Sequence, residues 1–147
     1  MARALNRAAF TIHVMTALFL VVVKPAANGA DSCRSMDLGY QLFNGQRALV
    51  AHLRDDNRML PDIAARCINC HDHADNAASF APPLTSRYLL SDTRRRGGPP
   101  SRYNLSSFCR VLNVGVDPTG IVLKKAMPQY ALSDTECAAL WSFVTAP

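Results

Sequence analysis

The stretch Cys67-Ile68-Asn69-Cys70-His71 decides what this chain folds around. It has the pattern C-x-x-C-H, in which two cysteines lie three positions apart and a histidine follows directly. On one helical turn, two thiols at this spacing point to the same side, so both can add to the two vinyl groups of one porphyrin. The imidazole of His71 then lies where it can bind the iron. The motif therefore predicts one covalently attached haem c, held by Cys67 and Cys70, with His71 as an axial ligand.

Three other interpretations use the same residues. A dithiol redox motif is expected near a βαβ pattern, which the sequence does not show. A zinc site made of Cys67, Cys70, His71 and His73 would crowd four ligands together, whereas structural zinc sites usually take their second ligand pair from a separate segment. A disulfide between Cys67 and Cys70 would close a loop of the size used in catalytic rather than structural bonds. The context of the motif favours haem over all three.

Residues 1–30 have the order of a secretory signal peptide. A basic start is followed by an apolar stretch, residues 8–23, and then by Lys24, a proline and small residues. The apolar stretch is short for a membrane span, which needs about 20 residues, although an uncleaved anchor remains the alternative. We therefore expect export to the periplasm and one mature haem domain, residues 31–147.

The basic character of the full chain, which carries a formal charge of +5 at pH 7, comes mostly from this leader. Residues 1–30 contain three basic side chains and no acid, which leaves 13 Lys and Arg against 11 Asp and Glu. We therefore infer no nucleic-acid partner. We expect membrane contact only transiently or through an uncleaved signal. A domain of this length buries a small core on its own, so a haem would supply much of it.

The elements expected in residues 31–147 are all helical. Apolar residues at three- and four-residue steps predict a helix from Leu38 to Leu53. Asn104 is a good N-cap for a helix that ends at Gly115. Shorter helical turns are expected at Pro61-Asp62 and at residues 88–90, and a basic, turn-rich loop at residues 94–100.

The last helix is the best defined element. Ser133 and Glu136 form the capping box S-x-x-E, and an apolar face follows it. The residues of that face are Cys137, Leu140, Trp141 and Val144. Since no strand pattern is evident, the sequence predicts an all-α chain with long loops.

Met127 is the candidate for the second axial ligand. It precedes a proline that stiffens the backbone, and its thioether is a soft, neutral donor that favours ferrous iron. The alternative is that Met127 only packs in the core. Other candidates are weaker, because His73 follows His71 too closely to reach the opposite haem face. His52 and Met59 would need a different fold.

The order of these motifs resembles the class I cytochromes c. In that family an N-terminal helix, C-x-x-C-H, a proline-leucine segment, a middle helix, a Met-Pro loop and a C-terminal helix follow one another. The matching residues are Gly39-x-x-Leu42-Phe43, Cys67/Cys70/His71, Pro82-Pro83-Leu84, Leu105 through Gly115, Met127-Pro128-x-Tyr130, and Leu132-Ser133-x-x-Glu136 through Val144. The resemblance implies a cytochrome c-like helical fold wrapped around one covalent haem, with His71 and Met127 as axial ligands.

The resemblance also implies two contacts. A carbonyl near Pro82 or Pro83 accepts a hydrogen bond from the second nitrogen of His71. The first and last helices cross, which places Gly39 and Phe43 near Leu140 and Trp141.

Two features depart from the family pattern. Residues 46–66 form an unusually long segment between the first helix and the haem motif, so the first helix is either longer or split. Cys109 and Cys137 are not general features of the family, yet both lie on apolar faces of helices that flank the Met127 loop. We expect a disulfide between them rather than buried thiols, since an exported chain can keep that bond. Cys33 is either free or paired elsewhere.

The predicted function is electron transfer by an exported monohaem protein that is not an enzyme. Its partners would be a periplasmic dehydrogenase as donor and a terminal oxidase or another cytochrome as acceptor. A dedicated subunit of one dehydrogenase is a variant of this hypothesis. The alternatives are a ligand-binding or catalytic haem protein in which Met127 leaves the iron open, and a thiol or zinc module without haem. Residues Arg94 to Arg96 could meet propionates or an acidic partner, but a solvated basic loop is the simpler interpretation.

Overall fold

The structure is a computed structural model that describes residues 29–71 and 81–147. Most of the predicted signal peptide, residues 1–28, and the weak ligand candidate His73 lie outside the described residues. In the part of the chain that is described, no helix is long and apolar enough to cross a membrane.

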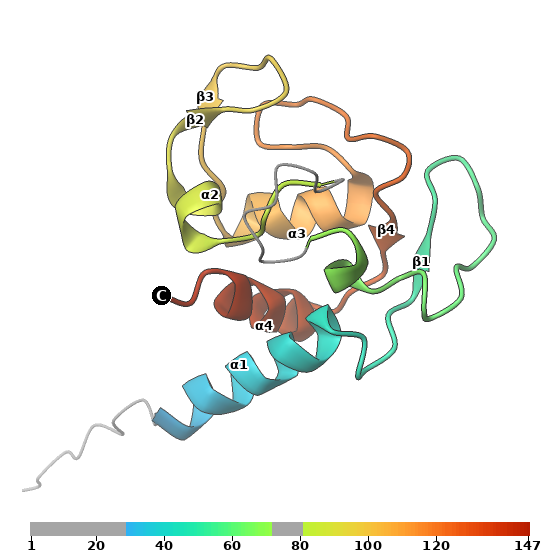
Figure 1. Ribbon diagram of the computed structural model, residues 1–147, viewed down its shortest axis with the longest axis vertical. Coiled ribbons are helices and arrows are strands. Elements are labelled where there is room, and N and C mark those ends of the chain that lie inside the picture. Colours follow the sequence, from blue (N-terminus) through green and yellow to red (C-terminus); the bar gives the residue numbers. More distant parts are fainter. Residues whose placement is uncertain (1–28, 72–80) are drawn as a thin grey trace, which may run out of the picture.

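Helices and short strands alternate along the chain (Figure 1). The α-helices are α1 (Gly29–Phe43), α2 (Ser86–Leu90), α3 (Leu105–Val114) and α4 (Asp134–Val144), and a 3-10 helix, η1, spans Cys67–Asn69. The strands are β1 (Ala51–His52), β2 (Thr93–Arg94), β3 (Pro100–Ser101) and β4 (Gln129–Tyr130). Strand β1 pairs antiparallel with β4, and β2 pairs antiparallel with β3.

The predicted all-α, cytochrome c-like fold is wrong for this chain, because residues 29–71 and 81–147 combine helices with two antiparallel sheets. The same residues contain no group of three or more His, Cys, Asp or Glu side chains that could hold a metal ion. Each strand has only two residues, which is too short to show the alternating apolar pattern of a strand. In addition, β1 and β4 are distant in the sequence, so no local pattern predicts their pairing.

Two predicted helices begin and end where their capping residues lie. The side chain of Asn104 accepts a hydrogen bond from the backbone N–H of Ser107, and α3 ends at Gly115, whose φ of 68° is left-handed. The side chains of Ser133 and Glu136 cap α4 reciprocally, as the S-x-x-E pattern predicted. Both helices are confirmed, as is the single turn now seen as α2.

Helix α1 ends ten residues earlier than the predicted Leu38–Leu53 helix, at Phe43. Gly45 adopts a left-handed φ of 70°, and its N–H bonds to the carbonyl of Leu42, a geometry that terminates helices. Leu49 therefore lies in irregular chain and is buried there rather than on a helix face. The apolar spacing was real, but the glycine changes the direction of the chain.

Helix α4 lies between α1 and α3 (Figure 1). A Cβ atom on Gly39 would lie 2.6 Å from Cβ of Phe143 and would also meet the backbone of Ala139, so α1 approaches α4 as closely as its backbone allows. The rings of Phe43 and Phe143 are 5.4 Å apart. The two helices therefore pack against each other as expected, and the atoms nearest to a Cβ on Gly39 belong to Ala139 and Phe143.

A disulfide joins α3 to α4 through Cys109 and Cys137, whose Cα atoms are 5.8 Å apart. This is the bond that the sequence predicted. Of the other cysteines, Cys67 is buried and Cys33 is exposed, and neither they nor Cys70 form a disulfide. The bond braces the two helices between which the Met127 segment runs.

Candidate functional site

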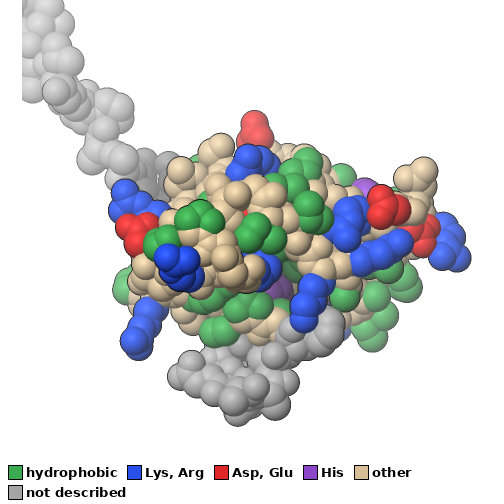
Figure 2. All heavy atoms as spheres, turned by 90° about the horizontal axis from the view of Figure 1, so that it is seen from above, with side chains coloured by type: hydrophobic (Ala, Val, Ile, Leu, Met, Phe, Trp, Pro, Cys, Tyr) green, Lys and Arg blue, Asp and Glu red, His purple; other side chains and the backbone are tan. Residues whose placement is uncertain are grey.

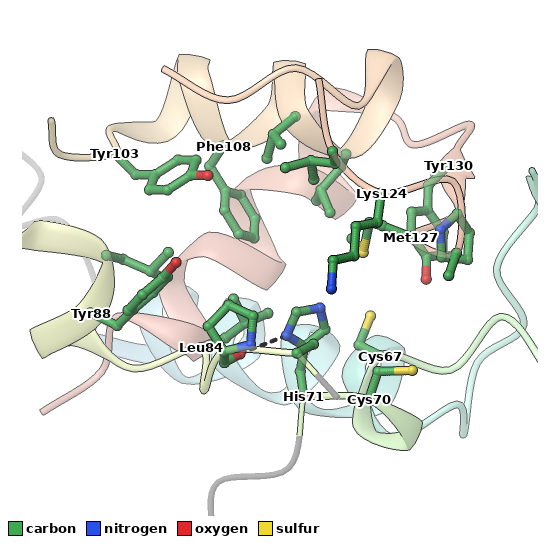
Figure 3. A pocket seen from close by; sticks show the side chains of 18 of the residues that line it. Cys67, Cys70, His71, Leu84, Tyr88, Tyr103, Phe108, Lys124, Met127 and Tyr130 are labelled. Atoms are coloured by element: carbon green, nitrogen blue, oxygen red, sulfur yellow. Dashed lines mark hydrogen bonds between the residues drawn. The ribbon is translucent and has the colours of Figure 1, made fainter. Parts of the chain in front are cut away.

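A cavity of about 390 Å³ lies among α2, η1, α3 and the segment before β4 (Figure 3). Its walls are largely apolar and aromatic. Helix α3 contributes Phe108, Val111 and Leu112, and α2 contributes Tyr88 and Leu89. Of these, Phe108 and Leu112 belong to the apolar face that the helical periodicity predicted, and the cavity is lined by residues that also form the core.

The C-x-x-C-H motif forms one wall of this cavity. Residues Cys67–Asn69 fold as η1, and the N–H of His71 bonds back to the carbonyl of Cys67 at 3.0 Å. The tight turn brings Cys67, Cys70 and His71 to the same cavity.

The imidazole of His71 is held in one orientation and points into the cavity (Figure 3). Nδ1 lies 2.8 Å from the carbonyl oxygen of Pro82, and because that oxygen can only accept, Nδ1 carries the proton and donates. The contact predicted near Pro82 or Pro83 is thus confirmed. The other ring nitrogen, Nε2, is buried and has no hydrogen-bond partner among the described residues. Burial lowers the pKa of His71, partly opposed by the bond to Pro82.

Cys67 is the more enclosed of the two motif cysteines. Burial raises the pKa of its thiol to about 12, and the neighbouring Tyr130 hydroxyl opposes this only in part. The Tyr130 hydroxyl donates to the carbonyl of Ala65 at 3.1 Å. Tyr130 thus ties β4, just after the Met-Pro pair, to the segment that enters the haem motif. The sequence pattern contained Tyr130 but did not show this connection.

Met127 lines the same cavity as His71. Its N–H bonds to the carbonyl of Lys124 at 3.0 Å, which closes a turn directly before β4. The side chains of Met127 and Lys124 enter the cavity from this turn, across from η1 (Figure 3). The weaker candidates lie elsewhere: Met59 is 56% exposed, and neither it nor His52 lines the cavity.

Three cationic side chains, Arg66, Arg96 and Lys124, line the cavity, and no described acidic side chain does. The predicted solvated basic loop is wrong for Arg95, which is only 3% exposed and lies over the rings of Tyr88 and Tyr103, with centroid distances of 4.9 and 5.3 Å. Arg94 and Arg96 are exposed as expected. On the face of the molecule seen in Figure 2, basic side chains are more frequent than acidic ones.

Arg96 forms an ion pair with Asp117 at 2.9 Å. Asp117 was not among the predicted site residues. The only local signal is the run Asp117-Pro118-Thr119-Gly120, which is typical of a turn, and no sequence pattern links it to Arg96.

The described side chains suit a flat, largely apolar group that carries negative charges at its edge. The apolar walls match a porphyrin, and Arg66 and Lys124 would offer positive charge to two propionates, while Arg96 is already paired with Asp117. The buried Nε2 of His71 lacks only an acceptor for its lone pair, which a haem iron would be. This agreement is a test of fit by donor type and charge.

A comparison with protein-family models, curated proteins and solved structures found no match to this chain.

Proposed function

We propose that this chain is an exported monohaem c-type cytochrome. It would carry electrons between a periplasmic dehydrogenase, as donor, and a terminal oxidase or another cytochrome, as acceptor. The observation that carries the proposal is the state of His71 beside Cys67 and Cys70. Its Nδ1 is engaged by Pro82, and its Nε2 is buried without a partner at a cavity that both cysteines line.

A bound haem would supply an iron that takes up and gives back one electron. Cys67 and Cys70 would hold the porphyrin covalently, and His71 and Met127 would bind the iron from its two sides. The hydrogen bond from Nδ1 to Pro82 keeps the imidazole in one tautomer and makes Nε2 a stronger donor. A thioether as the second ligand favours the ferrous state.

The surroundings of the cavity support the same function. Apolar walls exclude water and lower the local dielectric constant, so charges at the rim act more strongly than they would in water. Arg66 and Lys124 add positive charge to the lining, whereas the charge of Arg96 is balanced by Asp117, and positive charge favours the reduced, less positive iron. We therefore expect a reduction potential above that of a bis-histidine haem in a polar site.

The experiment is a set of visible absorption spectra of the protein made in a periplasm that attaches haem. Spectra are recorded oxidised, reduced, and reduced with carbon monoxide. We expect a covalent, low-spin haem that is indifferent to carbon monoxide. Cys67→Ala and Cys70→Ala should each lose one covalent attachment, whereas Cys33→Ala, at an exposed cysteine, should match the parent protein.

A second pair of variants tests the ligand across the cavity. Met127→Ala should give high-spin iron that binds carbon monoxide, and it should lower the reduction potential. Met59→Ala is the control, because Met59 is exposed and away from the cavity. If the parent protein itself binds carbon monoxide readily, it is an open-site haem protein rather than a carrier. If it holds no covalent haem, the two thiols return to redox or zinc chemistry.

A further inference from the structure

The ion pair between Arg96 and Asp117 joins two loops that are far apart in the sequence. Asp117 is 0% exposed and lies between α3 and Met127, whereas Arg96 follows β2. The distance from Nη2 of Arg96 to Oδ2 of Asp117 is 2.9 Å. A buried carboxylate is costly unless it is fully paired, so such a residue needs a reason for its position.

One oxygen of Asp117 organises its own turn. Oδ1 accepts hydrogen bonds from the N–H of Thr119 at 2.9 Å, from its hydroxyl at 2.7 Å, and from the N–H of Ile121 at 2.9 Å. The segments before and after this turn are also bonded to each other, because the N–H of Leu123 donates to the carbonyl of Gly115 at 2.8 Å. These donors outweigh the effect of burial and hold the pKa of Asp117 below its ordinary value. The other oxygen, Oδ2, points to Arg96.

Arg96 lies in the loop that connects β2 to β3. Its guanidinium donates to Asp117 and lies 3.4 Å from the hydroxyl of Tyr103, and both Arg96 and Tyr103 line the cavity. The two loops also touch directly. A Cβ atom on Gly98 would lie 2.8 Å from Cδ1 of Ile121 and 2.9 Å from Oγ1 of Thr119. Both loops lie on the same side of the molecule, at the top of Figure 1.

The turn leads straight into the segment that carries the proposed iron ligand. Leu123 and Lys124 line the cavity directly after the turn, and Met127 bonds back to Lys124. On the other flank, Arg54 holds the carbonyl of Leu123 at 2.7 Å. The segment 123–127 is therefore held at its start by the Asp117 turn on one side and by Arg54 on the other.

We propose that Asp117 is a positioning residue that fastens the turn 117–121 to the β2–β3 loop through Arg96 and so keeps Met127 at the cavity. This inference rests on the proposed function, because it requires Met127 to bind the iron. Loss of the pair removes the side-chain bond between the turn and the β2–β3 loop. The turn then stays attached to α3 through the bond from Arg110 to the Asp117 carbonyl, and Met127 would leave the iron more often.

The test compares Asp117→Asn with Asp92→Asn in the haem-loaded protein. Asparagine at 117 can still accept from Thr119 and Ile121, but it removes the charge that faces Arg96. Asp92 is exposed and directly precedes β2, so its change removes one charge without touching the pair. For Asp117→Asn we expect carbon monoxide to bind the reduced protein about tenfold faster or more, because the buried charge that holds Arg96 is gone and Met127 would be less firmly placed.

Hydrogen exchange gives a second measurement that does not depend on the iron. The amides of Thr119 and Ile121 should exchange about tenfold faster in Asp117→Asn and at the parent rate in Asp92→Asn. Arg96→Gln should reproduce the carbon monoxide effect, and the double variant should be no faster than either single variant, because both changes break one pair. If Asp117→Asn does not fold, the rate at which Arg96→Gln binds carbon monoxide tests the inference in its place.

The inference is overturned if these variants unfold more easily while the reduced protein binds carbon monoxide at the same rate as Asp92→Asn. That result would mean that the pair supports only the general stability of the protein. Failure of the proposed function looks different, because the parent protein would then lack a covalent haem or bind carbon monoxide itself.

Discussion

The close crossing of α1 and α4 predicts that Gly39→Ala destabilises the protein. The new Cβ would lie 2.6 Å from Cβ of Phe143 and 2.8 Å from the carbonyl carbon of Ala139. One of these atoms is part of the α4 backbone and the other is bonded directly to it, so neither can move by a side-chain rotation. The two helices must therefore move apart. Overpacking of this kind costs about 3 kcal/mol at the upper end, whereas the better helix propensity of alanine returns about 1 kcal/mol. The expected net loss is about 2 kcal/mol.

Urea unfolding followed by circular dichroism measures this change. The midpoint should fall while the slope stays constant, since the same surface is exposed on unfolding. Asp37→Ala is the control, because Asp37 is exposed on the same helix and makes only a 3.3 Å contact with Gln41. It should change stability by less than about 0.5 kcal/mol. If Gly39→Ala is as stable as this control, the close approach of the two helices is not rigid and the reasoning fails.

Two further predictions concern the cysteines. Replacing both Cys109 and Cys137 by Ala should lower the free energy of unfolding by about 3.5 kcal/mol, because the bond closes a loop with a sequence separation of 28; a loss under about 1 kcal/mol in urea would contradict this. In the haem-free chain, the pKa of about 12 at Cys67 lies above the value of about 8.5 of an unfolded thiol, so the folded chain keeps a proton that the unfolded chain releases. Stability should therefore be unaffected well below pH 8.5 and should fall by about 1.4 kcal/mol at pH 9.5. Urea unfolding at both pH values tests this, and the loss should vanish in Cys67→Ala but remain in Cys33→Ala.

Local chemistry explains why part of the structure followed from the sequence. The side chains that cap α3 and α4, Asn104 and Ser133, bond to backbone groups within one turn, so a short window contains the whole interaction. The turn of C-x-x-C-H is equally local. The pairing of Cys109 with Cys137 was reached through the positions of two such helices. The predicted haem and its ligands remain proposals.

Long-range contacts decided the rest. Strands β1 and β4 exist only because the fold brings Ala51 beside Tyr130, and two residues carry no strand pattern of their own. The all-α prediction failed for this reason. Similarly, the sequence around Arg96 is typical of a solvated basic loop. The ion pair with Asp117 forms only because the fold brings a distant turn to this loop. The sequence alone determined the motif, the caps and the apolar faces, because those interactions span a few residues. Only the tertiary structure decided the sheets, the cavity and its buried charges, because their energies depend on neighbours that the chain meets after folding.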